Sequence, residues 1–443
     1  MIKVGFVSLG CSKNLCDTEV MLHVLEAAGC EIVADETQAD VIIINTCAFI
    51  ESAKKEAIDN ILDVAWLKKH RSLRGIVVCG CLAERYREEI FTEMPEVDAL
   101  IGVGSLANIY EAVKSAYDHE KYSSFEDKNS CPLGGERLLT TEPHMAYLKI
   151  AEGCDNRCTY CAIPSIRGRF RSRPIDDLVE EAKALEESGC LELNIIAQDT
   201  TRYGLDLYGE YSLARLVRAI TDATTIPWIR LLYCYPDKIT PELIDEMKNN
   251  PRLLHYMDLP IQHINDGILR RMNRHGGAEL IKENIAKLKS EIPDLVVRTT
   301  VIVGFPGESE DAFSELCEYV KSERFDRLGA FTYSAEEGTP AAEFEDQIDE
   351  QVKEDRYDII MREQLAVSDE KNRGRVGSVV TMLIEGFDPV SEAYYGRSYA
   401  EAADVDPKIY FTGRPGQYKV GSFIKAEITD MLDYDLIAEP IEQ

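Results

Sequence analysis

Three cysteines that share one short segment are the strongest chemical signal in the 443-residue sequence. Cys154, Cys158 and Cys161 form a Cys-x-x-x-Cys-x-x-Cys pattern directly after an apolar strand expected over Ala146–Ile150. Three thiolates at this spacing can bind three irons of a four-iron, four-sulfur (4Fe–4S) cluster and leave the fourth iron open to another ligand. A structural zinc site is the alternative, but such sites usually take four ligands in two pairs, and no fourth Cys or His stands nearby. The spacing therefore favours an iron–sulfur cluster.

A second set of cysteines follows three apolar segments near the start of the chain. Cys11, Cys47 and Cys81 come directly or shortly after strands expected over Lys3–Ser8, Val41–Asn45 and Gly75–Val78. Because the carboxyl ends of neighbouring parallel strands meet at one edge of a sheet, the three thiols should converge there. Cys79 is a second candidate beside Cys81, but its position at the end of the expected strand favours a buried side chain. The pattern predicts a second metal site.

The elements that must position these cysteines suggest an α/β fold with three domains. Strands and helices alternate over residues 1–125, which predicts an N-terminal parallel α/β sheet domain. Six further strand–helix units over residues 140–373 predict a central partial β/α barrel, a fold that places chemistry at the carboxyl ends of its strands. Polar residues 117–140 are expected to link the two. Short strands over residues 374–443 predict a small antiparallel β-barrel.

The composition of the chain indicates which partners and which cellular compartment to expect. The chain has 49 basic and 79 acidic residues, a net charge of −30, which repels bulk nucleic acid and attracts basic partners. It shows neither a secretory signal nor an apolar run long enough to span a membrane, so a cytoplasmic location is expected. In that reducing compartment the thirteen cysteines are not a disulfide framework.

The residues around the first cysteine set resemble those of one enzyme family. Its three-cysteine spacing is the signature of the radical S-adenosylmethionine (SAM) superfamily, and the segments 152–165, 167–168 and 172–174 resemble the methylthiotransferases within it. The resemblance implies that the cluster on Cys154, Cys158 and Cys161 binds and cleaves SAM. It also implies a second 4Fe–4S cluster on the other cysteine set, a TRAM-like C-terminal barrel, and a reductant protein such as flavodoxin or ferredoxin.

Six further residues are candidates for cofactor binding: Gln198, Arg167, Arg173, Gly304, Gly307 and Glu308. The glycines let backbone approach a ligand closely, and the resemblance places their turn along SAM; a simple strand-to-helix turn is the alternative. The arginines could bind the SAM carboxylate or an acidic substrate group, or lie on a solvated loop. Gln198 at the end of a strand could contact SAM or substrate, or cap a helix.

The substrate separates two branches of the methylthiotransferases. Segments 198–204, 258–263 and 333–339 resemble the branch that modifies the β-carbon of an aspartate in ribosomal protein S12 in two SAM-dependent steps. Residues 374–443 carry six basic and twelve acidic residues, which suits a basic protein better than RNA. A tRNA adenosine beside the anticodon is the less favoured substrate. A non-catalytic iron–sulfur electron carrier or a zinc-stabilised binding protein is the alternative of another class.

Overall fold

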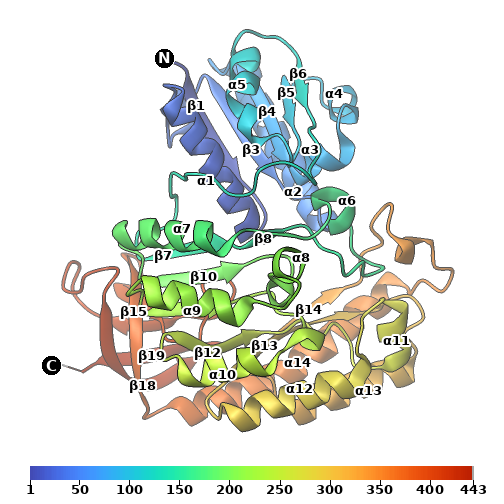
Figure 1. Ribbon diagram of the computed structural model, residues 1–443, viewed down its shortest axis with the longest axis vertical. Helices are drawn as coiled ribbons and strands as arrows, with labels where there is room; N and C mark the ends of the chain where they lie inside the picture. The colour runs from blue at the N-terminus through green and yellow to red at the C-terminus, as the bar shows by residue number, and fades with distance from the viewer. Residues whose placement is uncertain (442–443) are drawn as a thin grey trace.

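Six parallel strands form the first sheet of the computed structural model, which describes residues 1–441. In spatial order they are β2 (Glu31–Ile32), β1 (Lys3–Ser8), β3 (Val41–Thr46), β4 (Gly75–Gly80), β5 (Ala99–Ile101) and β6 (Tyr122–Ser124). Helices α1 (Ser12–Ala27) and α5 (Ile109–Tyr117) pack on one face, and α2 (Glu51–His70) and α3 (Cys81–Tyr86) pack on the other. The continuously apolar central strands explain this burial on both faces, and the expected parallel sheet is confirmed (Figure 1).

Three of these elements were not expected from the sequence. Strands β2 and β6 are short and lie at the two edges of the sheet. They lack the continuous apolar run of a central strand, which is the pattern that predicts one. Helix α5 buries Ile109, Ala112, Val113 and Ala116, which recur at the helical period along one face. The polar segment after α5 therefore includes a strand before it crosses to the second sheet.

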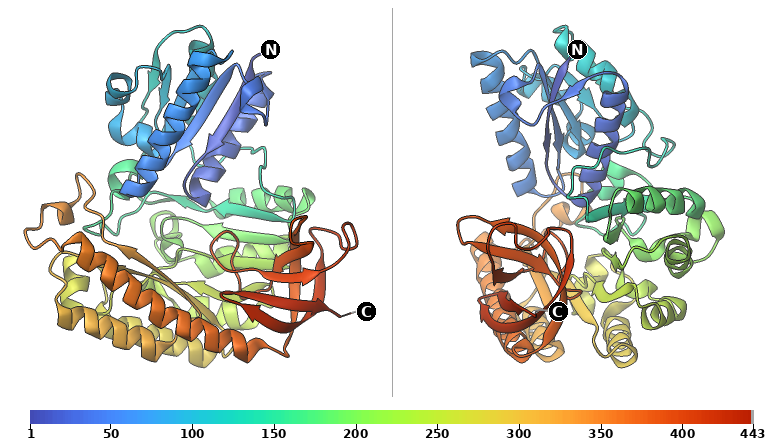
Figure 2. Two further views of the ribbon diagram at one scale, coloured as in Figure 1. Left: turned by 180° about the vertical axis from the view of Figure 1, so that it is seen from behind. Right: turned by 90° about the vertical axis from the view of Figure 1, so that its left-hand side faces the viewer.

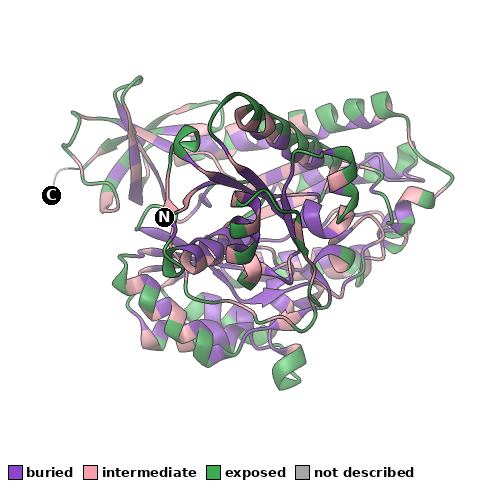
Figure 3. Ribbon diagram, turned by 90° about the horizontal axis from the view of Figure 1, so that it is seen from above, coloured by how far each residue is buried: buried purple, intermediate pink, exposed green. Residues whose placement is uncertain are grey.

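The second sheet is also parallel and is open, which confirms the partial barrel. Its order is β14 (Arg327–Thr332), β13 (Val296–Val303), β12 (Leu253–Asp258), β11 (Trp228–Leu231), β10 (Glu192–Ile196) and β7 (Met145–Lys149). The outer face is covered by α7 (Ile175–Glu187), α9 (Leu213–Ala223), α10 (Pro241–Asn249), α12 (Gly277–Glu291) and α13 (Glu310–Glu323). Figure 3 shows buried strands inside and exposed outer faces on the helices. No helix within residues 1–441 is long and apolar enough to span a membrane.

A long helix, α14 (Glu350–Arg375), leads into the closed C-terminal barrel (Figure 2). The barrel order is β15 (Val379–Asp388), β16 (Ala393–Arg397), β17 (Ile409–Thr412), β19 (Asp435–Pro440) and β18 (Phe423–Leu432). Every pairing is antiparallel, as expected, except that of β17 with β19. A closed ring with an odd number of strands must contain one parallel pair. Residues 442–443 of the expected barrel lie outside the described residues.

Buried polar contacts fasten the barrel to the second sheet. Glu192 at the start of β10 is fully buried and accepts hydrogen bonds from Arg397 Nη2 at 2.5 Å and Arg230 Nε at 2.8 Å. Trp228 packs edge-on against Phe423 of the barrel, with ring centroids 4.7 Å apart. Because these contacts involve the starts of β10 and β11, the carboxyl ends of the strands remain free to face the first domain.

Candidate active site between the two sheets

Each N-terminal cysteine stands at the carboxyl end of a strand, and its role as a metal ligand stays a prediction. Cys11 precedes α1, Cys47 follows β3, and Cys81 opens α3. Gly10 has a φ of +91°, and a Cβ atom there would lie 2.8 Å from the Cβ of Cys47. The loops that carry Cys11 and Cys47 are therefore in contact, and only glycine fits between them.

Charge and burial act on these thiols in opposite directions. Burial raises the pKa of Cys47 to about 12 and also raises that of Cys81. Cys11 is the exposed member of the set: desolvation by nearby groups would raise its pKa, but the positive charges of Lys13 and Arg167 lower it below its usual value. Metal binding requires thiolates, so these two cations favour the ligand form of Cys11.

Cys79 and Cys81 lie on opposite sides of β4. Cys79 is fully buried among the residues beneath α1 and α5, and its thiol is 3.6 Å from the carbonyl oxygen of Ile44. Cys81 packs with Ala162 and Ile166 of the second domain. Cys81 is therefore the cysteine that faces the junction between the sheets.

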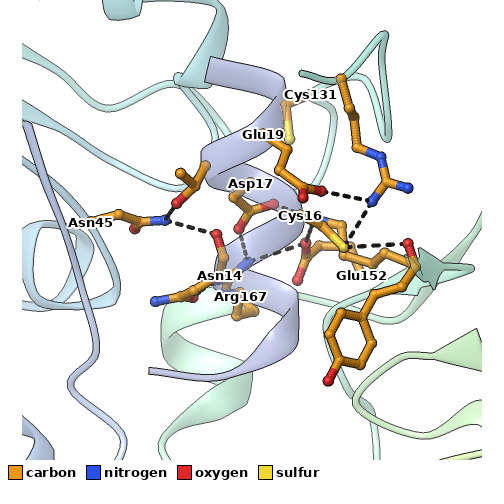
Figure 4. Close-up of polar contacts among 12 residues, drawn as sticks. Asn14, Cys16, Asp17, Glu19, Asn45, Cys131, Glu152 and Arg167 are labelled. Carbon is orange, nitrogen blue, oxygen red and sulfur yellow. Dashed lines mark hydrogen bonds and ion pairs between the residues drawn. The ribbon is translucent and has the colours of Figure 1, made fainter. Parts of the chain in front are cut away.

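A buried ionic network joins the two domains beside Cys81 (Figure 4). Arg167, in helix α6 (Ile163–Arg167), donates to Asp17 Oδ2 at 2.6 Å and Glu152 Oε2 at 3.2 Å, and its Nη2 lies 3.5 Å from the Cys81 sulfur. Lys149 pairs with the same two carboxylates. Two cations and two anions balance each other, which removes the large penalty of an unpaired buried charge.

The second cysteine set lies on the loop between β8 (Ala151–Glu152) and α6. Gly153 has a φ of +75°, and a Cβ atom there would come within 2.1 Å of the carbonyl oxygen of Arg169, so the loop folds tightly back on itself. Burial raises the pKa of Cys154 to about 11 and also raises that of Cys161. The Cys158 sulfur lies 2.9 Å from the hydroxyl of Tyr235.

One short segment after β11 connects the two cysteine sets. The Tyr235 hydroxyl reaches Cys158, whereas the Tyr233 ring lies beneath Lys13, with Nζ 3.2 Å from the ring centroid. Lys13 stands two residues after Cys11. Both cysteine sets therefore border one junction between the carboxyl ends of the two sheets.

The arginine candidates have partners within the chain. Arg167 is held in the ionic network, and Arg173 Nη2 lies 2.5 Å from Glu181 while its Nη1 donates to the Lys149 carbonyl at 2.9 Å. Both are buried, so neither lies on a solvated loop. These contacts give no support to binding of the SAM carboxylate, and that role stays a prediction.

The remaining candidates lie at the ends of strands in the second sheet. Gln198 donates to Glu152 Oε1 at 2.9 Å, and its own carbonyl oxygen is buried without a hydrogen-bond donor. Gly304 and Gly307 have φ values of +71° and +81°. Gly304 N–H donates to the Glu308 carboxylate at 2.7 Å, which is the contact of a strand-to-helix turn. Burial raises the pKa of Glu308 to about 7, although Arg356 opposes this.

Both cysteine sets consist of thiols, which are the ligands that iron–sulfur clusters take. Within residues 1–441 no three His, Cys, Asp or Glu side chains come close enough to hold one metal ion. A 4Fe–4S cluster instead takes each thiolate on a different iron. Each set could thus offer three thiols to such a cluster, and one of its irons would then have no protein ligand.

Comparison with known proteins identifies the family. Residues 3–102 match an uncharacterized protein family, UPF0004, residues 148–320 match the radical SAM superfamily, and residues 376–441 match the TRAM domain. The ribosomal protein uS12 methylthiotransferase RimO of Acetivibrio thermocellus is 47% identical over 449 residues, covering 100% of this chain and 99% of that protein. The protein of the same name from Geobacter sulfurreducens is 48% identical, covering 99% and 98%. The chain belongs to the ribosomal protein uS12 methylthiotransferase family.

Solved structures agree with the fold of this family member. The radical SAM methyltransferase TsrM of Kitasatospora setae superposes with a TM-score of 0.54 at 14% identity, covering 74% of this chain and 73% of that one. The radical SAM enzyme OxsB superposes with a TM-score of 0.50 at 14% identity, covering 83% and 56%. At this identity the likeness concerns the fold alone.

Sequence reasoning missed several side chains at the junction of this methylthiotransferase. Lys13 and Asn14 follow Cys11 closely, and Glu152 precedes Cys154 by two positions, so proximity to the cysteines could have indicated them. Tyr233 and Tyr235 carry no comparable signal, because only the fold brings the end of β11 to the cysteines.

Proposed function

We propose that the protein transfers a methylthio group to the β-carbon of an aspartate in ribosomal protein uS12, with SAM as a substrate. The relatives that carry this name match essentially the whole chain at 45–48% identity. The observation that supports the chemistry best is the shared junction, because sulfur insertion requires the reacting carbon to meet both the radical source and the sulfur source.

The cluster assignments are part of this proposal. Cys154, Cys158 and Cys161 would hold the 4Fe–4S cluster that binds SAM, and Cys11, Cys47 and Cys81 would hold a second one. When bound, such clusters supply the electron for SAM cleavage and the sulfur for insertion. The chain's own residues orient the ligands: the Tyr235 hydroxyl fixes Cys158, and Arg167 places positive charge 3.5 Å from Cys81.

The surface of the C-terminal barrel supports a basic protein substrate. Four of its twelve acidic residues contact arginine or tyrosine side chains within the chain: Glu385, Glu401, Asp404 and Asp406. Glu442 lies outside the described residues, which leaves seven acidic residues. Arg375 and Arg397 are likewise paired internally, which leaves Lys408, Arg414, Lys419 and Lys425. The balance stays negative, which opposes contact with an RNA backbone.

Partners and location follow from the same proposal. Reductive cleavage of SAM needs an electron donor, and a small reductant protein such as flavodoxin or ferredoxin suits that role. A substrate in the ribosome implies work in the cytoplasm.

The decisive experiment is anaerobic incubation of the reconstituted enzyme with SAM, a reductant, and either ribosomal protein uS12 or an anticodon stem-loop of tRNA. We expect mass spectrometry to find a methylthio gain on an aspartate of the protein. A gain on the RNA alone would overturn the substrate and the charge argument. SAM cleavage without any methylthio product on either substrate would overturn the transfer reaction itself.

A further inference from the structure

Lys13 is a buried cation with an unusual environment. It lies in the first turn of α1, two residues after Cys11, and only 7% of its surface is exposed. Its Nζ atom lies 3.2 Å from the centroid of the Tyr233 ring. A ring face offers partial negative charge, but it does not neutralise an ammonium group.

The other buried cations near the N-terminal cysteines have carboxylate partners. Arg167 and Lys149 share Asp17 and Glu152. Within residues 1–441, no ion pair joins Lys13 to any carboxylate. Its neighbouring anion within the chain is the Cys11 thiolate, so Lys13 is the one cation in this group that has no carboxylate partner and could take one from a bound substrate.

A further buried cation, Arg274, belongs to the other side of the junction. Its guanidinium lies 3.8 Å from the centroid of the Tyr235 ring and donates to the Pro260 carbonyl. Because Tyr235 contacts Cys158, the charge of Arg274 serves the second cysteine set. Lys13 is therefore the cation without a carboxylate partner on the side where sulfur would be supplied.

The backbone beneath Lys13 is held in a strained conformation. Tyr233 has a φ of +59°, which is unfavourable for a residue with a bulky side chain. Its N–H donates to Asp258 Oδ2 at 3.0 Å, and its carbonyl accepts from the Thr200 N–H at 3.0 Å. Contacts from both neighbouring strands thus fix the Tyr233 ring under the ammonium group, and strain of this kind concentrates at functional positions.

We propose that Lys13 binds the side-chain carboxylate of the target aspartate and thereby selects an acidic side chain at the junction. The inference rests on the proposed function, because it assigns one contact of that substrate. The carbon to be modified is bonded directly to the carboxylate carbon, so a salt bridge to Lys13 would hold that carbon between the two cysteine sets. Tyr233 acts as the positioning residue for Lys13.

The test is a double-mutant cycle on substrate binding. A fluorescent uS12 peptide that carries the target aspartate, and its asparagine counterpart, are titrated by anisotropy against reconstituted enzyme. The enzymes are the unaltered protein, Lys13→Met, Lys13→Arg, and Lys55→Met as a control on the exposed face of α2. We expect asparagine to weaken binding about tenfold or more in the unaltered and Lys55→Met proteins, since close charge pairs couple this strongly. In Lys13→Met the two peptides should bind within about twofold of each other, while Lys13→Arg should retain the preference.

Iron content and methylthio transfer, measured on the same samples, separate the possible failures. If Lys13→Met still prefers the aspartate peptide as strongly as the unaltered protein, the inference is wrong. If Lys13→Met loses iron while the preference persists, Lys13 serves a cluster and not the substrate. If the unaltered protein does not modify uS12 at all, the proposed function fails, and the inference falls with it. Should Lys13→Met not fold, Lys13→Gln replaces it in the cycle.

Discussion

Substituting Glu192 by glutamine should loosen the C-terminal barrel from the central sheet. Glu192 is fully buried between Arg230 of β11 and Arg397 of β16, 205 residues away in sequence. Glutamine keeps nearly the same shape but removes the charge, so Arg230 loses its counter-ion and Arg397 keeps only Glu385. Breaking a buried ion pair from one side typically costs about 3–5 kcal/mol.

The titration of Glu192 gives a second route to the same magnitude. The positive charges of Arg397 and Arg230 outweigh burial and lower the pKa of Glu192 from 4.5 to about 2. The difference between the two values corresponds to about 3 kcal/mol. Because the pKa is lowered on folding, this stabilisation is present above pH 4.5 and is lost as the pH falls toward 2. Glu192→Gln should therefore flatten the dependence of stability on pH in that range.

Trp228 offers a local probe for the measurement. The chain has two tryptophans, and Trp66 is 53% exposed on α2, so Trp66→Phe leaves Trp228 as the reporter at the contact with Phe423. In this background, thermal unfolding at pH 7 is followed by Trp228 emission for Glu192→Gln and for the exposed control Glu180→Gln. A loss of about 3 kcal/mol corresponds to a midpoint roughly 6–12 °C lower for a unit of this size. Equal midpoints for the two variants would refute the argument that this ion pair fastens the barrel.

Three further predictions concern the junction itself. Cys81→Ala should reduce the iron content of the reconstituted protein to about half, whereas Cys79→Ala should keep the full iron content. The reverse result in iron analysis would contradict the assignment of Cys81. Cys158→Ala should abolish the formation of 5′-deoxyadenosine, which chromatography measures. Cys47→Ala should retain SAM cleavage and yield no methylthio product. Methylthiolated uS12 from Cys47→Ala would show that the second cluster takes no part in the reaction. Arg167→Met leaves Asp17 and Glu152 with too little positive charge and should lower the free energy of unfolding by about 3–5 kcal/mol. Urea titration measures this free energy, and the exposed control Arg169→Met should change it little. Similar values for the two variants would show that the ionic network contributes nothing to stability.

The local sequence pattern predicted much of the fold and the strand ends at which the cysteines stand. Continuous apolar runs identified the central strands of both sheets, because a strand covered on both faces admits few polar residues. The parallel order of the strands places Cys11, Cys47 and Cys81 at the same edge of the sheet, which the sequence predicted without coordinates. The edge strands β2 and β6 were not predicted because they are short and only partly buried. Strand β16 was not predicted either, although most of its residues are buried.

Tertiary structure decided the partners of the charged and aromatic side chains. Arg167 binds Asp17 across 150 residues, and Tyr235 reaches Cys158 across 77. The position of Lys13 over Tyr233 likewise depends on how the first domain docks onto the second. The sequence by itself thus determined the elements and the strand end at which each cysteine stands, since these depend on local periodicity. The ionic and aromatic contacts depend on packing between distant segments, and no local pattern encodes such packing.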